Sequence, residues 1–136
     1  SDDQVNGTNN SYIAYCFAEK KGYSKFSSYT GNGSTDGSFI YTGFAPAFIM
    51  CKKYSSTGNW VIQDSKRDYS FNTHAADLNP NLTEAEEGNG AVDFLSNGFK
   101  MRNTDQDNNY NGATYIYMAF AEAPLVGTNN VPCNAR

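Results

Sequence analysis

Asp105, Asp107 and Asn109 are the residues best suited to binding a metal ion. They place side-chain oxygens at alternate positions, as the first three ligands of a calcium-binding loop do. Such a loop needs glycine at its sixth position and glutamate at its twelfth, where this chain has Tyr110 and Ile116. The pattern is incomplete, and a solvated turn is the simpler interpretation. Ca²⁺ is the one candidate cofactor.

Residues suited to catalysis are few. His74 is the only histidine, and no G-x-S-x-G motif marks a nucleophile. Glu84, Glu86 and Glu87 form one acidic run without the apolar pocket that raises the pKa of a catalytic carboxyl group. We therefore expect no catalytic residues and no enzyme activity.

Four aromatic residues are candidates for stacking on sugar rings. They lie in expected loops or at expected strand ends, where binding residues concentrate. They are Trp60, Tyr54, Tyr69 and Tyr110. The alternative is that Trp60 fills the core.

The three cysteines are Cys16, Cys51 and Cys133. An odd number leaves at least one thiol outside any intramolecular disulfide. Cys16 and Cys51 lie within apolar runs, so buried free thiols are expected, with a Cys16–Cys51 disulfide as the alternative. No CxxC motif accompanies them, and the spacing fits no zinc site.

The elements that would position these residues are strands. The chain has 136 residues, 15% of them aromatic and 18% charged, with many Gly and Asn. This composition is typical of one all-β domain with tight turns. The net charge of −4 and the pI near 4.8 argue against nucleic-acid binding. No apolar run is long enough for membrane insertion.

Hydrophobic patterning predicts eight or nine short strands. The expected strands are residues 12–18, 23–30, 38–42, 47–53, 60–63, 92–95, 99–101 and 114–121. Asn97-Gly98 predicts a hairpin turn with positive φ, and residues 83–86 predict at most one short helical turn. The fold class is a single antiparallel β-sandwich, jelly-roll or concanavalin-like.

The expected organisation is a polar N-terminal arm at 1–11, the sandwich at 12–122 and a C-terminal tail at 123–136. The chain begins with Ser rather than Met and shows no signal-peptide pattern. We expect either a processed chain or a fragment of a longer one.

One strand motif occurs twice. YIAYCFAE at 12–19 and YIYMAFAE at 115–122 agree at five of eight positions, at an offset of 103 residues. One interpretation is that the first copy closes a preceding module in an array of similar domains. The other is that two central strands of one sandwich have converged in composition. The first interpretation predicts that residues 12–18 lie at a sheet edge or on a neighbouring chain.

Several segments carry a resemblance to a known group of proteins. They are FAEKKGYSKFSSYTGNGSTDG (17–37), YTGFAPAFIMCKK (41–53), STGNWVIQDSKRD (56–68), FLSNGFKMR (94–102) and TYIYMAFAEAPL (114–125). Together they cover about half of the chain, and it is the set rather than any one segment that is specific. The chain resembles a domain of tail-fibre and other virion proteins of marine tailed bacteriophages, often found after laminin-G-like or SPRY-like domains. The resemblance implies a β-sandwich on the virion surface. It also implies that the 12–19 type of strand recurs at module junctions.

The expected function is a non-enzymatic structural or attachment module, in a tail fibre or appendage that contacts host glycans. Its partners would be other virion proteins, copies of itself and a host surface glycan. One alternative is a capsid decoration protein, which the terminal segments 1–11 and 123–136 would suit by draping over neighbours. Another is a free secreted carbohydrate-binding domain. The sequence leaves the placement, the glycan and the oligomeric state open.

Overall fold

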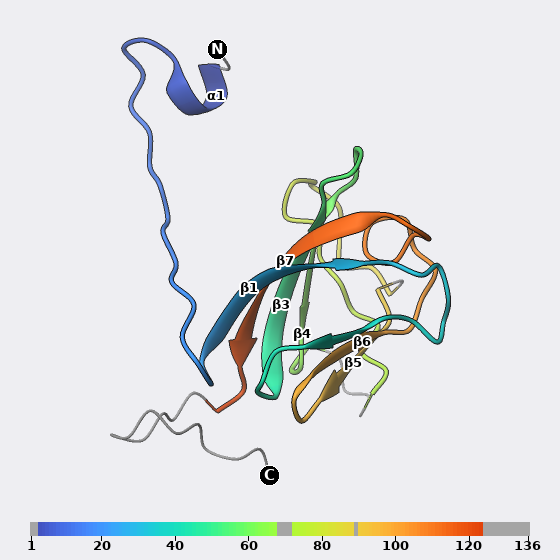
Figure 1. Ribbon diagram of the computed structural model, residues 1–136. Helices are drawn as coiled ribbons and strands as arrows, with labels where there is room; N and C mark the ends of the chain where they lie inside the picture. The colour runs from blue at the N-terminus through green and yellow to red at the C-terminus, as the bar shows by residue number, and fades with distance from the viewer. Residues whose placement is uncertain (1–2, 68–71, 89, 124–136) are drawn as a thin grey trace.

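Two antiparallel sheets form a β-sandwich, as expected (Figure 1). The computed structural model describes residues 3–67, 72–88 and 90–123. A four-stranded sheet, sheet A, has the order β1-β7-β3-β4, and a three-stranded sheet, sheet B, has the order β2-β6-β5. The strands in chain order are β1 (Ser24–Thr30), β2 (Phe39–Tyr41), β3 (Pro46–Lys53), β4 (Trp60–Asp64), β5 (Val92–Leu95), β6 (Gly98–Met101) and β7 (Thr114–Ala121).

Strand β7 is central to sheet A. It pairs with β1 from Thr114 to Phe120 on one side and with β3 on the other. Because side chains alternate along a strand, one set of its residues faces sheet B and the other faces away. The inward set contributes to a core that β1, β3 and sheet B complete. Its largest fully buried side chains include Tyr115, Phe99, Ile49 and Met101.

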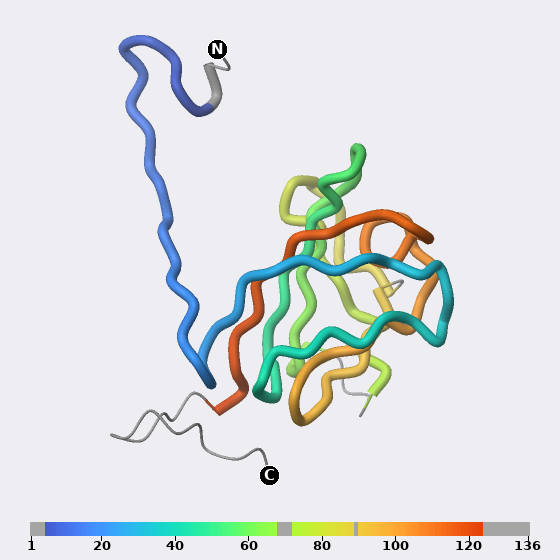
Figure 2. The backbone as a smooth tube through the Cα atoms, in the orientation of Figure 1, coloured from blue at the N-terminus to red at the C-terminus, as the bar shows by residue number. Residues whose placement is uncertain are grey.

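The segment 12–18 differs from the sequence-based expectation. We expected a strand within the sandwich, but these residues form no strand and are exposed. Figure 2 shows this segment leaving the two sheets as an arm, and Figure 1 shows the short helix α1 (Asp3–Asn6) at its far end. The sandwich therefore begins near residue 20, and the arm is longer than the predicted 1–11. Residues 12–18 thus lie neither at the centre of the domain nor at a sheet edge, and their addition to a neighbouring chain stays a prediction.

Two smaller expectations are also corrected. The described part of the chain has seven strands rather than eight or nine, because residues 12–18 are not among them. No helical turn forms at 83–86, and α1 is the one helix among the described residues. The apolar run that should follow a helix start is missing after Glu86, so nothing stabilises a turn there.

The hairpin of β5 and β6 forms, but not for the reason expected. Leu95 pairs with Gly98, so Ser96 and Asn97 are the two turn residues. Neither Asn97 nor Gly98 has a positive φ. Instead, a Cβ on Gly98 would lie 2.2 Å from the backbone oxygen of Ile40 in β2. The glycine is required because sheet B brings two backbones close together at this point.

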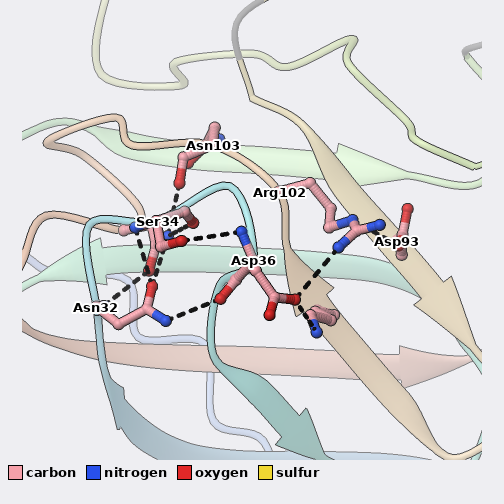
Figure 3. Close-up of polar contacts among 8 residues, drawn as sticks. Asn32, Ser34, Asp36, Asp93, Arg102 and Asn103 are labelled. Atoms are coloured by element: carbon pink, nitrogen blue, oxygen red, sulfur yellow. Dashed lines mark hydrogen bonds and ion pairs between the residues drawn. The ribbon is translucent and has the colours of Figure 1, made fainter.

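The loop at 31–37 is held to sheet B by polar contacts (Figure 3). Asp36 lies 2.6 Å from Lys100 and 3.6 Å from Arg102, and Arg102 also contacts Asp93. A hydrogen bond from Lys100 and the positive charges of Lys100 and Arg102 lower the pKa of Asp36. Within the loop, Ser34 Oγ accepts a hydrogen bond from the Asp36 backbone N–H. The loop is thereby fixed as a rim of the sandwich.

Replacing Gly98 with alanine tests the close approach of β2 and β6. We expect G98A to lower the free energy of unfolding by about 1–3 kcal/mol, because the added methyl group forces two strands apart. Chemical denaturation measures the change. Gly88→Ala is the matched control, since a Cβ there meets no atom within 4 Å. Equal stabilities of the two variants would contradict the packing described.

Three buried tyrosines make the fold sensitive to alkali. Burial and the nearby Cys51 raise the pKa of Tyr29 well above its usual value, and its hydroxyl donates a 2.6 Å hydrogen bond to the backbone oxygen of Asn108. Burial also raises the pKa of Tyr115 and of Tyr117 to about 12. Their neutral forms are thus favoured in the folded chain.

Stability should therefore fall as the pH rises above the usual tyrosine pKa of about 10. Below that pH the contribution of these hydroxyls is fully present, because folded and unfolded chains are both neutral there. Between about 10 and about 12 the unfolded chain loses protons that the folded chain keeps, and stability is lost. Denaturation curves at a series of pH values measure this. A flat stability over that interval would show that the tyrosines ionise without unfolding.

Candidate functional site

The outer face of sheet A, which points away from sheet B, carries an open apolar groove. It has a volume of about 510 Å³ and is lined almost entirely by apolar side chains. The lining comes from β1, β3, β4 and β7 and from the residue after β3: Phe26, Ser27, Ser28, Met50, Tyr54, Trp60, Ile116, Tyr117 and Met118.

Strand register explains why these residues meet. Phe26, Met118 and Met50 are neighbours in one row across the sheet. The next row runs from Ser28 through Ile116 and Lys52 to Trp60, and the row on the other side holds Phe120 and Phe48. All of these side chains belong to the set that points away from the core. The outer face therefore carries large apolar side chains in three successive rows, which is unusual for a solvated sheet face.

The structure brings together two of the four predicted sugar-stacking residues. Trp60 and Tyr54 both line the groove, and the alternative that Trp60 fills the core is wrong. Tyr110 lies outside the groove lining, in the loop before β7, with the ammonium group of Lys53 5.6 Å from its ring centre. Tyr69 lies outside the described residues.

Sequence reasoning missed most of the groove, including Phe26, Met50, Ile116 and Met118. A signal was available, because the run TYIYMAFA is apolar at almost every position. A strand with one solvated face alternates apolar and polar residues, so this run predicts a sheet whose second face is also covered or binds something.

The arm touches this outer face at one point. The ring centre of Phe17 lies 6.1 Å from that of Phe26 and 5.9 Å from that of Phe120. Ser24 Oγ donates a hydrogen bond of 3.0 Å to the backbone oxygen of Ala18. A longer hairpin between the arm and β1 would use the backbone oxygen of Ala18 as a hydrogen-bond acceptor. The side chain of Ser24 already bonds to that oxygen. The pairing of the arm with β1 stops after Lys20–Ser24.

The predicted calcium ligands are held in separate contacts. Asp107 accepts hydrogen bonds from the backbone N–H and the side-chain amide of Asn59. Asp105 accepts one from the backbone N–H of Asp107. The side chain of Asn109 is buried and bridges Asn32 to Asn103. The three side chains therefore have hydrogen-bond partners within the chain. The calcium site stays a prediction.

A second, smaller cavity of about 160 Å³ is polar. Its lining includes the carboxyl groups of Asp77, Glu84, Glu87, Asp105 and Asp107. Across the described ranges, no three His, Cys, Asp or Glu side chains lie close enough together to hold a metal ion. Glu86, the remaining member of the acidic run, instead pairs with Arg67 at 3.2 Å.

His74 and the described cysteines have packing roles or exposed positions. The His74 ring is buried against Phe94, with 5.2 Å between ring centres. Cys51 is a free buried thiol, as expected, and burial raises its pKa to about 12. Cys16 is also free but exposed, so its expected burial and the alternative disulfide are both wrong. Cys133 lies outside the described residues.

Comparison with known proteins gives one family match. A family model described as a domain of unknown function, DUF7483, matches residues 1–124, which include the arm and both sheets. No curated protein and no solved structure matches the chain. Within the described ranges, no helix has the length and apolar character needed to cross a membrane.

Proposed function

The chain belongs to the DUF7483 family, a domain of unknown function, and we propose that it is a non-enzymatic structural or attachment module of a bacteriophage virion surface. The observation that carries this proposal is the exposure of two apolar surfaces: the arm residues 12–17 and the groove of sheet A. Large exposed apolar patches on a folded domain are typical of interaction sites. Such surfaces suit a component of an assembly.

The virion part of the proposal rests on the resemblance to phage tail-fibre domains. The segments that carry this resemblance are 17–37, 41–53, 56–68, 94–102 and 114–125. A tail fibre or appendage is the placement we favour, because those domains belong to multi-domain fibres. The arm would also suit a capsid decoration protein, since it reaches away from the sandwich and would contact a neighbouring subunit.

Mass spectrometry of purified phage particles tests the placement. We expect peptides of this chain in intact virions, and among the proteins of detached tails rather than of emptied capsids. Particles without the chain would contradict the virion proposal. Peptides confined to the capsid fraction would support the decoration alternative.

Glycan contact is a second candidate function that one observation favours. Trp60 and Tyr54 share the groove with Ser28, which lies in the outward row with Ile116. Aromatic faces and nearby hydrogen-bonding groups are the two features that sugar-binding sites combine. This feature also supports the alternative of a free secreted carbohydrate-binding domain.

A glycan array tests this second candidate. If the groove binds sugars, we expect Trp60→Ala to weaken binding by roughly tenfold or more, because a buried aromatic contact is typically worth at least that factor. Tyr110→Ala is the control, since Tyr110 lies outside the groove. An array on which the wild-type chain binds no host polysaccharide would leave the structural role and remove the glycan role.

A further inference from the structure

The arm presents three largely exposed apolar side chains. Ile13 is 84% exposed, Tyr15 is 82% exposed and Phe17 is 59% exposed, and the three alternate along an extended segment. In the ranges that the structure describes, no backbone hydrogen bond from another segment reaches 13–17. Side chains of this size are normally removed from water. The segment therefore has the character of a strand that lacks its sheet.

The outer face of β7 has a matching spacing. Ile116, Met118 and Phe120 lie on it at every second position, and the first two line the groove. Ile13, Tyr15 and Phe17 have the same spacing, so both sets extend over about 13 Å. This match follows from the repeated motif, because Ile13 and Ile116 hold the same position in it, as do Phe17 and Phe120.

The contact between arm and face is already present at one end. Phe17 packs on Phe26 and Phe120 at the edge of the outer face, and the chain then leaves that face (Figure 1). Two contacts hold the chain in this path. They are the hydrogen bond from Ser24 Oγ to the backbone oxygen of Ala18 and the ion pair between Glu19 and Lys25. The rest of the face, from Met118 to Trp60, stays open.

We propose that residues 12–15 of one copy of this chain pack in the sheet A groove of a second copy. Within one chain the arm and the groove both remain open, although only a short segment connects them. A second copy supplies a groove for the arm of the first and an arm for its groove. Two copies that exchange arms reciprocally satisfy both grooves and close with two-fold symmetry. This proposal adds a partner, a second copy of the chain, to the structural role proposed above. It stands even if the chain is not part of a virion.

Energy transfer between two differently prepared chains tests the proposal. Trp60, the only tryptophan, lies in the groove, and Cys16, which is exposed, lies on the arm. The donor chain carries Cys16→Ser and Cys133→Ser. The acceptor chain carries Trp60→Phe and Cys133→Ser, with a dansyl-type dye on Cys16, and Cys51 is buried from the dye. Since Trp60 and the dye are on different chains, any transfer reports contact between copies.

We expect transfer that rises with donor concentration and saturates. Tyr15→Asp in the acceptor arm should weaken the association by roughly tenfold or more, because it puts a charge into an apolar groove. Tyr41→Asp is the matched control, since Tyr41 is 61% exposed on β2 of the other sheet. The arm lies outside the sandwich, so Tyr15→Asp leaves the fold intact, and circular dichroism verifies this.

Two results would overturn the proposal. The first is an absence of transfer at every concentration. The second is equal weakening by Tyr15→Asp and Tyr41→Asp, which would indicate nonspecific adhesion.

Discussion

Strand β7 is the element on which the rest of the structure depends. It joins β1 to β3, and it pairs with them over most of its eight residues. Its inward side chains, Tyr115, Tyr117 and Ala119, fill the core against sheet B. Its outward side chains include the apolar Ile116 and Met118, which line the groove. A central strand with two apolar faces stabilises the sandwich on one side and leaves an adhesive surface on the other.

The same motif occurs in the arm with a different outcome. Residues 12–19 share five of eight positions with residues 115–122, yet one copy is a central strand and the other is exposed. Local sequence is thus not what separates the two, because both copies favour extended structure. The difference is position in the chain: β7 is flanked by strands that pair with it, whereas the arm leaves the sandwich after the Lys20–Ser24 pair. This contrast is why we infer a partner for the arm.

Much of the fold could be predicted from the sequence, and the groove could not. Period-two patterning and turn residues give the strands of both sheets, with 92–95 and 114–121 predicted to the residue. Patterning reports that a face is apolar, but not whether the chain itself covers that face. For this reason residues 12–18 were expected inside the sandwich. Trp60 was expected at a strand end or in the core, without its neighbours Met50 and Met118. The need for Gly98 comes from a contact with β2, which no local turn signal contains.

The emission spectrum of Trp60 tests the central claim most directly, because this single tryptophan lies in the groove and needs no label. If the arm of a second copy covers the groove, the emission maximum of the unmodified chain should move to shorter wavelength as protein concentration rises from nanomolar to high micromolar. Spectra that are identical at all concentrations, in a chain shown to be folded, would contradict it.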